Sequence, residues 1–126
     1  MSIKRIITFV TATLFMFVVY SATAQNQFEG VTIQTVTVGG NVSMLVGQGG
    51  NIGVSAGDDG ILIIDDQFAP LAGRIKSAIE SLGSAVPKFV LNTHFHGDHT
   101  GSNAEFGLDS LIVAHENVRS RLEAAD

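Results

Sequence analysis

The sequence has 126 residues, with 7 Lys and Arg side chains against 12 Asp and Glu, so its formal net charge is −5. This length suits one domain or part of one, and the acidic balance excludes a basic surface for a nucleic-acid backbone. Cysteine is absent, which excludes disulfides and thiolate metal ligands.

The N-terminus has the pattern of a secretory signal peptide. Lys4 and Arg5 precede an apolar run, residues 6–20, that is too short to span a bilayer comfortably, and a small-x-small sequence ends at Ala24. We therefore expect residues 1–24 to be cut off, with an uncleaved anchoring helix as the alternative. Cleavage leaves five of the 7 basic side chains against 12 acidic ones. The expected product is periplasmic or secreted, with no membrane attachment and no nucleic-acid partner.

A flexible leader is expected over residues 25–30, and the folded part over residues 31–126.

Four short runs rich in Val, Ile and Leu begin the folded part, and segments that contain glycine separate them. Glycine supplies the positive φ that tight hairpin turns need. The pattern predicts an antiparallel meander. The four predicted strands are residues 31–38, 42–46, 52–55 and 61–64.

After Asp65 and Asp66 the apolar residues recur at helical spacing, which predicts a helix with one face on the sheet. The residues concerned are Leu71, Ile75, Ile79 and Leu82, with Pro70 in the first turn and Gly83 at the end. Pro87 then opens a predicted strand over residues 88–91. The remaining predicted elements are a short helical turn over residues 102–107, a strand over 111–114 and a helix over 116–125.

Three of the 4 histidines fall in the segment NTHFHGDHT, residues 92–100. In an extended chain His94 and His96 point to the same side, and Gly97 allows a turn that lets Asp98 and His99 face a second ion. Histidines in a polar loop, each bonded to a backbone carbonyl, are the alternative. Because several imidazoles and a carboxylate are costly to bury together without an ion, the cluster favours metal binding. Nitrogen and oxygen ligands favour zinc, with iron and manganese as alternatives.

The sequence from His94 to His99 has the pattern H-x-H-x-D-H and resembles the ligand motif of the metallo-β-lactamase superfamily. The segments GILIIDD, residues 60–66, and AHENVRSRL, residues 114–122, are also similar to segments of that superfamily. The resemblance implies an α/β (α+β) fold, the first half of a four-layer αβ/βα sandwich. Residues 31–126 would form the N-terminal half of such a domain.

The resemblance also implies hydrolysis of a small molecule by water activated at a one- or two-zinc site. His94 and His96 would bind one ion, while Asp98 and His99 would bind the other, and Asp98 would act in catalysis by orienting the hydroxide. Three further residues would support the ligands by hydrogen bonds: Asp65, Asn92 and Thr93. His115, the remaining histidine, is expected to cap the last helix instead of binding metal.

The superfamily takes its remaining ligands from the second half of the domain, and none of these is found in this sequence. The alternative is therefore a truncated, catalytically incomplete half-domain that binds metal at most weakly. β-Lactams, thioesters, lactones and sulfur compounds all stay open as substrates, because the loops that select substrate vary independently of the fold. The oligomeric state stays open as well.

Overall fold

The computed structural model of the chain describes residues 27–125, which belong to two units, Met1–Gly30 and Val31–Asp126. In the first unit, residues 27–30 form a turn, and the predicted signal peptide lies outside the described residues. Among the helices of the described part, none is both long and apolar enough to cross a membrane.

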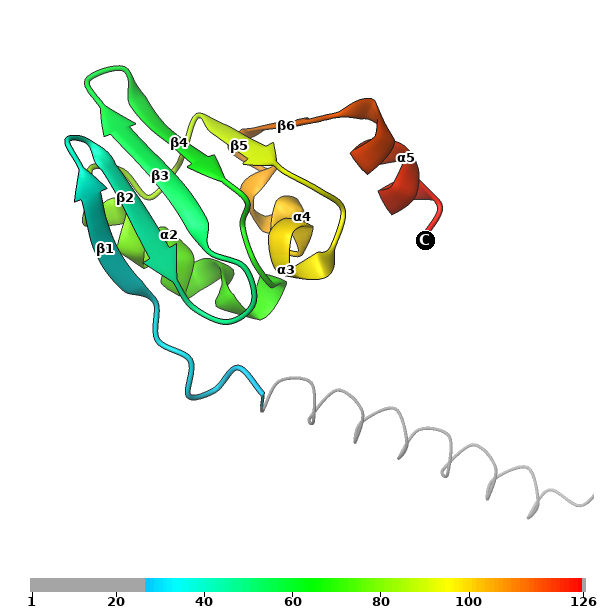
Figure 1. Cartoon of the computed structure of the whole chain (residues 1–126), viewed down its shortest axis with the longest axis horizontal. Coiled ribbons are helices and arrows are strands. Elements are labelled where there is room, and N and C mark those ends of the chain that lie inside the picture. The colour runs from blue at the N-terminus through cyan, green and yellow to red at the C-terminus, as the bar shows by residue number, and fades with distance from the viewer. Residues whose placement is uncertain (1–26, 126) are drawn as a thin grey trace, which may run out of the picture. The chain divides into compact units, whose positions relative to one another are not determined.

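The second unit is built on one six-stranded sheet whose strands lie in sequence order (Figure 1). The strands are β1 Gln34–Gly39, β2 Val42–Val46, β3 Ile52–Gly57, β4 Gly60–Ile64, β5 Phe89–Asn92 and β6 Leu111–Ala114. The first four pair antiparallel, which confirms the predicted meander, and β5 and β6 are added in parallel. The prediction that β1 begins at Val31 is wrong by three residues, because its partner β2 ends at Val46, opposite Gln34.

Five helical segments follow the meander or lie between the parallel strands. They are the 3₁₀-helix η1 Ala69–Leu71 and the α-helices α2 Ala72–Glu80, α3 Gly97–Thr100, α4 Asn103–Phe106 and α5 Glu116–Glu123. The predicted helix is present, but its first turn is the 3₁₀ turn that contains Pro70. It buries Ile75 and Ile79 completely, and Gly83, with φ of 148°, lies just beyond its end. His115 caps α5, since its Nδ1 accepts a hydrogen bond from Asn117 N at 3.1 Å, as predicted.

The two faces of the sheet are both apolar but differ in exposure. One face packs against the helices and holds buried side chains from every strand between β2 and β5: Leu45, Ile52, Val54, Ile61, Ile63 and Val90. On the opposite face, Phe89 is 40% exposed and Leu111 is 61% exposed, and these two residues lie side by side in the β5–β6 register. Apolar side chains on both faces are typical of sheets that are covered by other elements on both sides.

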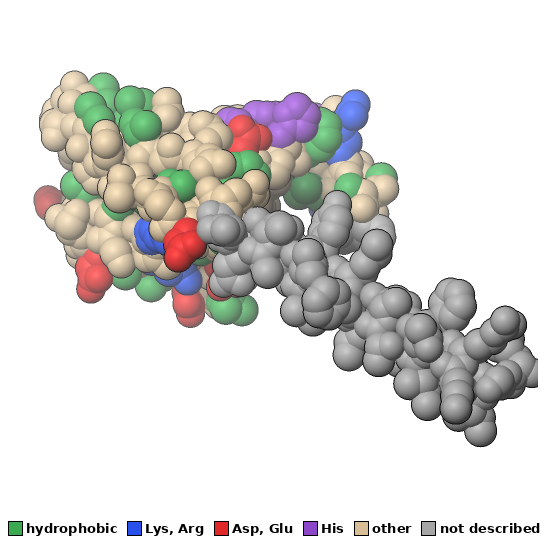
Figure 2. Space-filling view, turned by 90° about the horizontal axis from the view of Figure 1, so that it is seen from below, with side chains coloured by type: hydrophobic (Ala, Val, Ile, Leu, Met, Phe, Trp, Pro, Cys, Tyr) green, Lys and Arg blue, Asp and Glu red, His purple; other side chains and the backbone are tan. Residues whose placement is uncertain are grey.

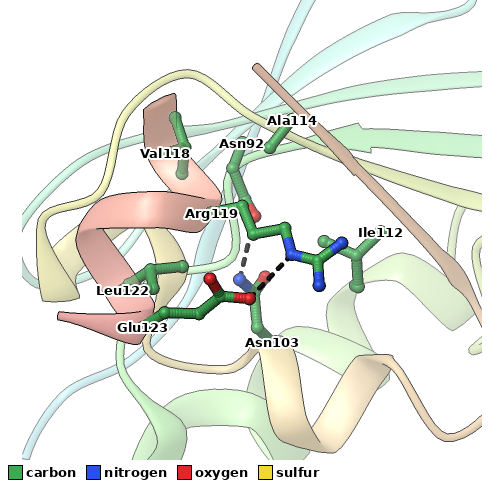
Figure 3. A pocket seen from close by; sticks show the side chains of 8 residues that line it. All are labelled: Asn92, Asn103, Ile112, Ala114, Val118, Arg119, Leu122 and Glu123. Atoms are coloured by element: carbon green, nitrogen blue, oxygen red, sulfur yellow. Dashed lines mark hydrogen bonds and ion pairs between the residues drawn. The ribbon is translucent and has the colours of Figure 1, made fainter. Parts of the chain in front are cut away.

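A pocket of about 360 Å³ opens beneath α5, next to β6 and α4 (Figure 3). Its walls include Ile112, Val118 and Leu122, and the exposed ion pair between Arg119 Nε and Glu123 Oε1, 2.8 Å apart, lies at its side. None of the residues that line this pocket is a histidine, but Asn92, one of the predicted site residues, is among them.

Candidate metal centre

The parallel pairing of β4 and β5 places the predicted site residues at one edge of the sheet. Ile64 lies opposite Leu91, so Asp65 and Asn92 lie at the carboxyl ends of neighbouring strands. Asp65 N donates to Leu91 O at 2.8 Å. Asp65 has φ of 64°, in the left-handed region that residues other than glycine rarely adopt, at a cost of about 1–3 kcal/mol. The chain thus turns sharply out of β4 and aims the Asp65 side chain at the segment that follows β5.

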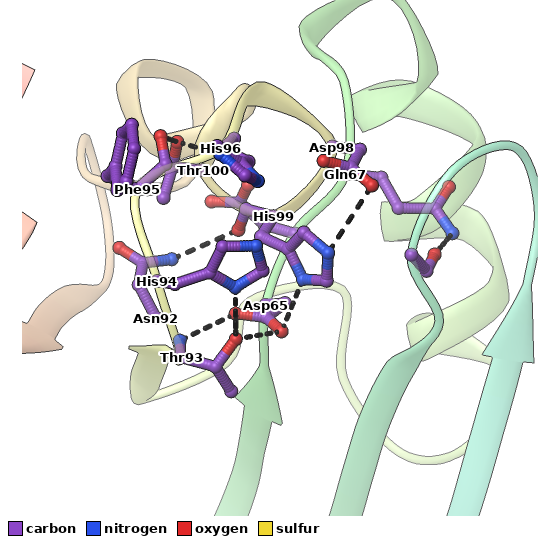
Figure 4. Close-up of polar contacts among 12 residues, drawn as sticks. Asp65, Gln67, Asn92, Thr93, His94, Phe95, His96, Asp98, His99 and Thr100 are labelled. Atoms are coloured by element: carbon purple, nitrogen blue, oxygen red, sulfur yellow. Dashed lines mark hydrogen bonds and ion pairs between the residues drawn. The ribbon is translucent and has the colours of Figure 1, made fainter.

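The Asp65 carboxylate contacts two other predicted site residues, Thr93 and His99 (Figure 4). Thr93 N donates to Asp65 Oδ1 at 2.8 Å, and Thr93 Oγ1 donates to Oδ2 at 2.8 Å. His99 Nδ1 lies 2.8 Å from the same Oδ2, and the hydroxyl of Thr93 also lies 3.0 Å from His94 Nδ1. Asp65 is 4% exposed, so a buried carboxylate fixes the orientation of the surrounding side chains.

The three histidines of the motif lie next to one another. The ring centroids of His94 and His99 are 4.0 Å apart, and those of His94 and His96 are 4.8 Å apart. Figure 2 shows histidine side chains gathered on one stretch of surface, beside an acidic side chain. The side chains of His99 and Asp98 are 20% and 33% exposed, so solvent reaches the cluster.

The second nitrogen of His99 faces another carboxylate. His99 Nε2 lies 3.3 Å from Asp98 Oδ2. When Nδ1 carries the proton that it donates to Asp65, Nε2 presents a lone pair toward an oxygen that also has only lone pairs. Two such acceptors repel each other unless a proton or a cation lies between them. A proton on Nε2 or a bound cation would therefore join His99 to Asp98.

The described residues nevertheless do not close a coordination shell. Within residues 27–125, no three side chains of His, Cys, Asp or Glu are arranged to hold a metal ion. Imidazole nitrogen and carboxylate oxygen suit zinc, which takes at least three protein ligands in catalytic sites. The donor chemistry of the predicted ligands thus fits zinc, while their arrangement supplies only part of a site.

Behind the histidines lies a buried layer of polar contacts. Asn92 Nδ2 donates to His99 O at 3.2 Å, and Asn103 Nδ2 donates to Asn92 Oδ1 at 2.9 Å. Asp66 N also donates to His99 O, at 3.1 Å, and Asp66 Oδ1 accepts from Ser102 N at 3.0 Å. Burial raises the pKa of Asp66 to about 7, an effect that the Ser102 hydrogen bond opposes and the Asp65 charge adds to. These contacts fix the backbone that carries His99.

Sequence reasoning missed the loop between β2 and β3 as a part of the site. Gly49 has φ of 85°, and a Cβ at this position would lie 2.6 Å from Asp98 Cβ. A Cβ at Gly50 would lie 2.5 Å from His99 Cε1. The glycine run that indicated a hairpin turn therefore also lets the backbone lie directly against two predicted ligands.

Comparisons with known proteins give matches among solved structures. No protein-family model and no curated protein matches the sequence. The chain is similar to BJP-1, a subclass B3 metallo-β-lactamase of Bradyrhizobium japonicum, with 30% identity and a TM-score of 0.65 over 73% of this chain and 36% of that one. It is also similar to the metallo-β-lactamase MIM-1 from Novosphingobium pentaromativorans, with 29% identity and a TM-score of 0.64. This match covers 71% of this chain and 34% of MIM-1.

A third structure, the metallo-β-lactamase FIM-1 from Pseudomonas aeruginosa in its mono-zinc form, shares the fold alone. It is 16% identical, with a TM-score of 0.64, and the match covers 75% of this chain and 46% of FIM-1. The chain thus spans about a third of the length of BJP-1 and MIM-1. The mixed sheet with its helices matches part of the metallo-β-lactamase fold, as predicted. The chain belongs to the metallo-β-lactamase superfamily.

Proposed function

We propose that the chain is part of a metal-dependent hydrolase that acts on a small-molecule substrate. The observation that carries the proposal is the chain of contacts from Asp65 through His99 to Asp98, with 2.8 Å at the first contact and 3.3 Å at the second. A carboxylate that fixes one nitrogen of an imidazole and leaves the other for a cation is the common arrangement around metal-binding histidines. Similarity to two metallo-β-lactamases supports the same reaction class.

Zinc is the proposed metal, as one or two ions, with iron and manganese as alternatives. His94 and His96 would hold one ion, and Asp98 and His99 the other. Zinc held in this way supplies a bound water that ionises near neutral pH. Thr93 and Asp65 fix the imidazoles, and the Asp98 carboxylate, which is one-third exposed, would orient the attacking water.

β-Lactams are the first substrates to test, because BJP-1 and MIM-1 are metallo-β-lactamases. Thioesters and lactones are the next, since the same attack of water on a carbonyl group opens them. The pattern of residues 1–24 supports action in the periplasm or outside the cell.

The test measures hydrolysis of a chromogenic β-lactam, a thioester and a lactone by the purified chain with and without added zinc. We expect zinc-dependent hydrolysis of at least one substrate, lost in the Asp98→Asn variant and kept in His115→Asn. The second substitution is a matched control, because His115 caps α5 and asparagine is a good N-cap residue. Hydrolysis that Asp98→Asn leaves unchanged would contradict the proposal. Zinc binding without turnover would instead support the incomplete half-domain.

A further inference from the structure

Gln67 joins the β2–β3 loop to the segment that carries the predicted ligands. Its side chain is fully buried, and its Nε2 donates a hydrogen bond to Gly50 O. Its backbone oxygen accepts a hydrogen bond from Ser102 N at 3.0 Å, just beyond α3. One residue therefore contacts both the β2–β3 loop and the backbone just beyond α3.

The loop, residues 47–50 and named here the glycine loop, is shaped to receive this side chain. A Cβ at Gly47 would lie 2.5 Å from Gln67 Oε1 and 3.2 Å from Nε2, so any side chain there would displace the carboxamide. The same loop lies against Asp98 at Gly49 and against His99 at Gly50. Contact with the carboxamide thus holds the loop where it touches the two ligands.

The conformation of Gln67 costs stability. Its φ of 56° is in the left-handed region, and its buried Oε1 has no hydrogen-bond partner among the described residues. A methionine would fill a similar volume without burying an unpaired oxygen. Residues that keep such costly conformations are typical of functional sites, where geometry matters more than stability.

We propose that Gln67 is a positioning residue, which holds the glycine loop against His99 and Asp98 and thereby fixes the His99 imidazole. The ring is then held from two sides, by Asp65 at Nδ1 and by the Gly50 backbone at Cε1. The inference rests on the proposed function only in one respect, which is that Asp98 and His99 are taken to be metal ligands. The contacts join only residues of this chain, so they can be tested without metal or substrate.

The experiment is nuclear magnetic resonance on the metal-free full chain. In the unmodified protein we expect a nuclear Overhauser effect (NOE) between Gly50 Hα and His99 Hε1, and slow exchange of the Gln67 carboxamide protons. Gln67→Met removes the donor, so the NOE disappears and the glycine-loop amides exchange roughly tenfold faster. The control is Gln34→Met, which removes an exposed glutamine from β1 and leaves both signals unchanged.

Persistence of the NOE and of the exchange rates in Gln67→Met would overturn the inference. The unmodified protein gives a second test, which does not depend on whether a variant folds. Fast exchange of its Gln67 carboxamide protons, together with the absence of an NOE between these protons and Gly50, would also overturn the inference. Failure of zinc binding or hydrolysis in the unmodified protein would contradict the proposed function alone. The NOE to His99 would still be expected in that case.

Discussion

The Asp65 carboxylate and the His99 imidazole lie 2.8 Å apart, although 34 positions separate them in the sequence. The contact forms because β4 and β5 are parallel neighbours, so that the residue after β4 meets the loop after β5. The contact directs Nδ1 of His99 toward Asp65, so that Nε2 is the nitrogen that faces Asp98.

Replacement of Asp65 by asparagine should weaken zinc binding by about 10- to 100-fold, because His99 loses the carboxylate that orients it. The carboxamide oxygen can still accept the hydrogen bond from Thr93 N, so the turn is retained. Competition with a chromogenic chelator measures the affinity. Asp58→Asn, in the exposed β3–β4 turn, removes the same charge far from the site and should change nothing. Equal affinities of the Asp65→Asn variant and the unmodified chain would show that Asp65 does not act on the ligands.

Asp66 should make the protein less stable as the pH rises from about 4 to about 7. The pKa of this buried carboxyl is about 7 in the folded chain, against 3.8 as its ordinary value, so the folded state binds the proton more tightly. Its stabilising contribution is complete below pH 4 and is lost as the folded carboxyl ionises. The free energy of unfolding should fall by a few kcal/mol across this window.

The Asp66→Asn substitution removes this pH-dependent contribution. The carboxamide oxygen of the asparagine can still accept the hydrogen bond from Ser102 N. Denaturant unfolding at several pH values should therefore give a flatter curve for the variant. The same slope in both proteins would show that Asp66 ionises normally.

The packing of α2 on the sheet should carry much of the stability. Ile79 is fully buried, and Ile79→Ala should lower the free energy of unfolding by about 2–5 kcal/mol, because the removed atoms leave a cavity. Glu80→Ala, at the next and exposed position, should have little effect. Chemical denaturation measures both. A small loss for Ile79→Ala would mean that α2 does not pack as described.

The exposed apolar face of the sheet should bind a hydrophobic dye in the folded state. Leu111 and Val113 are 61% and 43% exposed on the last strand. Replacing both with lysine should reduce dye fluorescence while the circular dichroism spectrum is kept, because charges remove the apolar patch. Fluorescence that does not change would place the dye elsewhere, for example in the pocket beneath α5.

Local patterns in the sequence predicted most of the fold. Short runs rich in Val, Ile and Leu, separated by glycine turns, located β1 to β4, and the spacing of Ile75 and Ile79 located α2. Helix α3, Gly97–Thr100, was missed because the motif has no helical apolar period. Its turn is stabilised instead by Thr100 Oγ1, which donates to His96 O at 3.1 Å.

The site was predicted less completely than the fold. The histidine cluster stands out because its members are adjacent in the sequence, and the contact of Asp65 with Thr93 follows once β4 and β5 pair. Gln67 was missed because its partner Gly50 lies 17 positions away, in a glycine run that is equally typical of an ordinary hairpin. A contact to a backbone atom far away in the sequence does not require a particular residue type there, so it leaves no pattern from which the sequence could predict it.

The most direct test of the metal centre is zinc binding by equilibrium dialysis with elemental analysis, on three forms of the full chain. The unmodified protein and His115→Asn should bind zinc saturably and equally, because His115 is the one histidine of the sequence outside the motif. The double variant Asp98→Asn, His99→Asn should bind less zinc, because it removes the two side chains that face each other and are assigned to one of the ions. Equal zinc binding by all three proteins would contradict the assignment of this cluster as a metal centre.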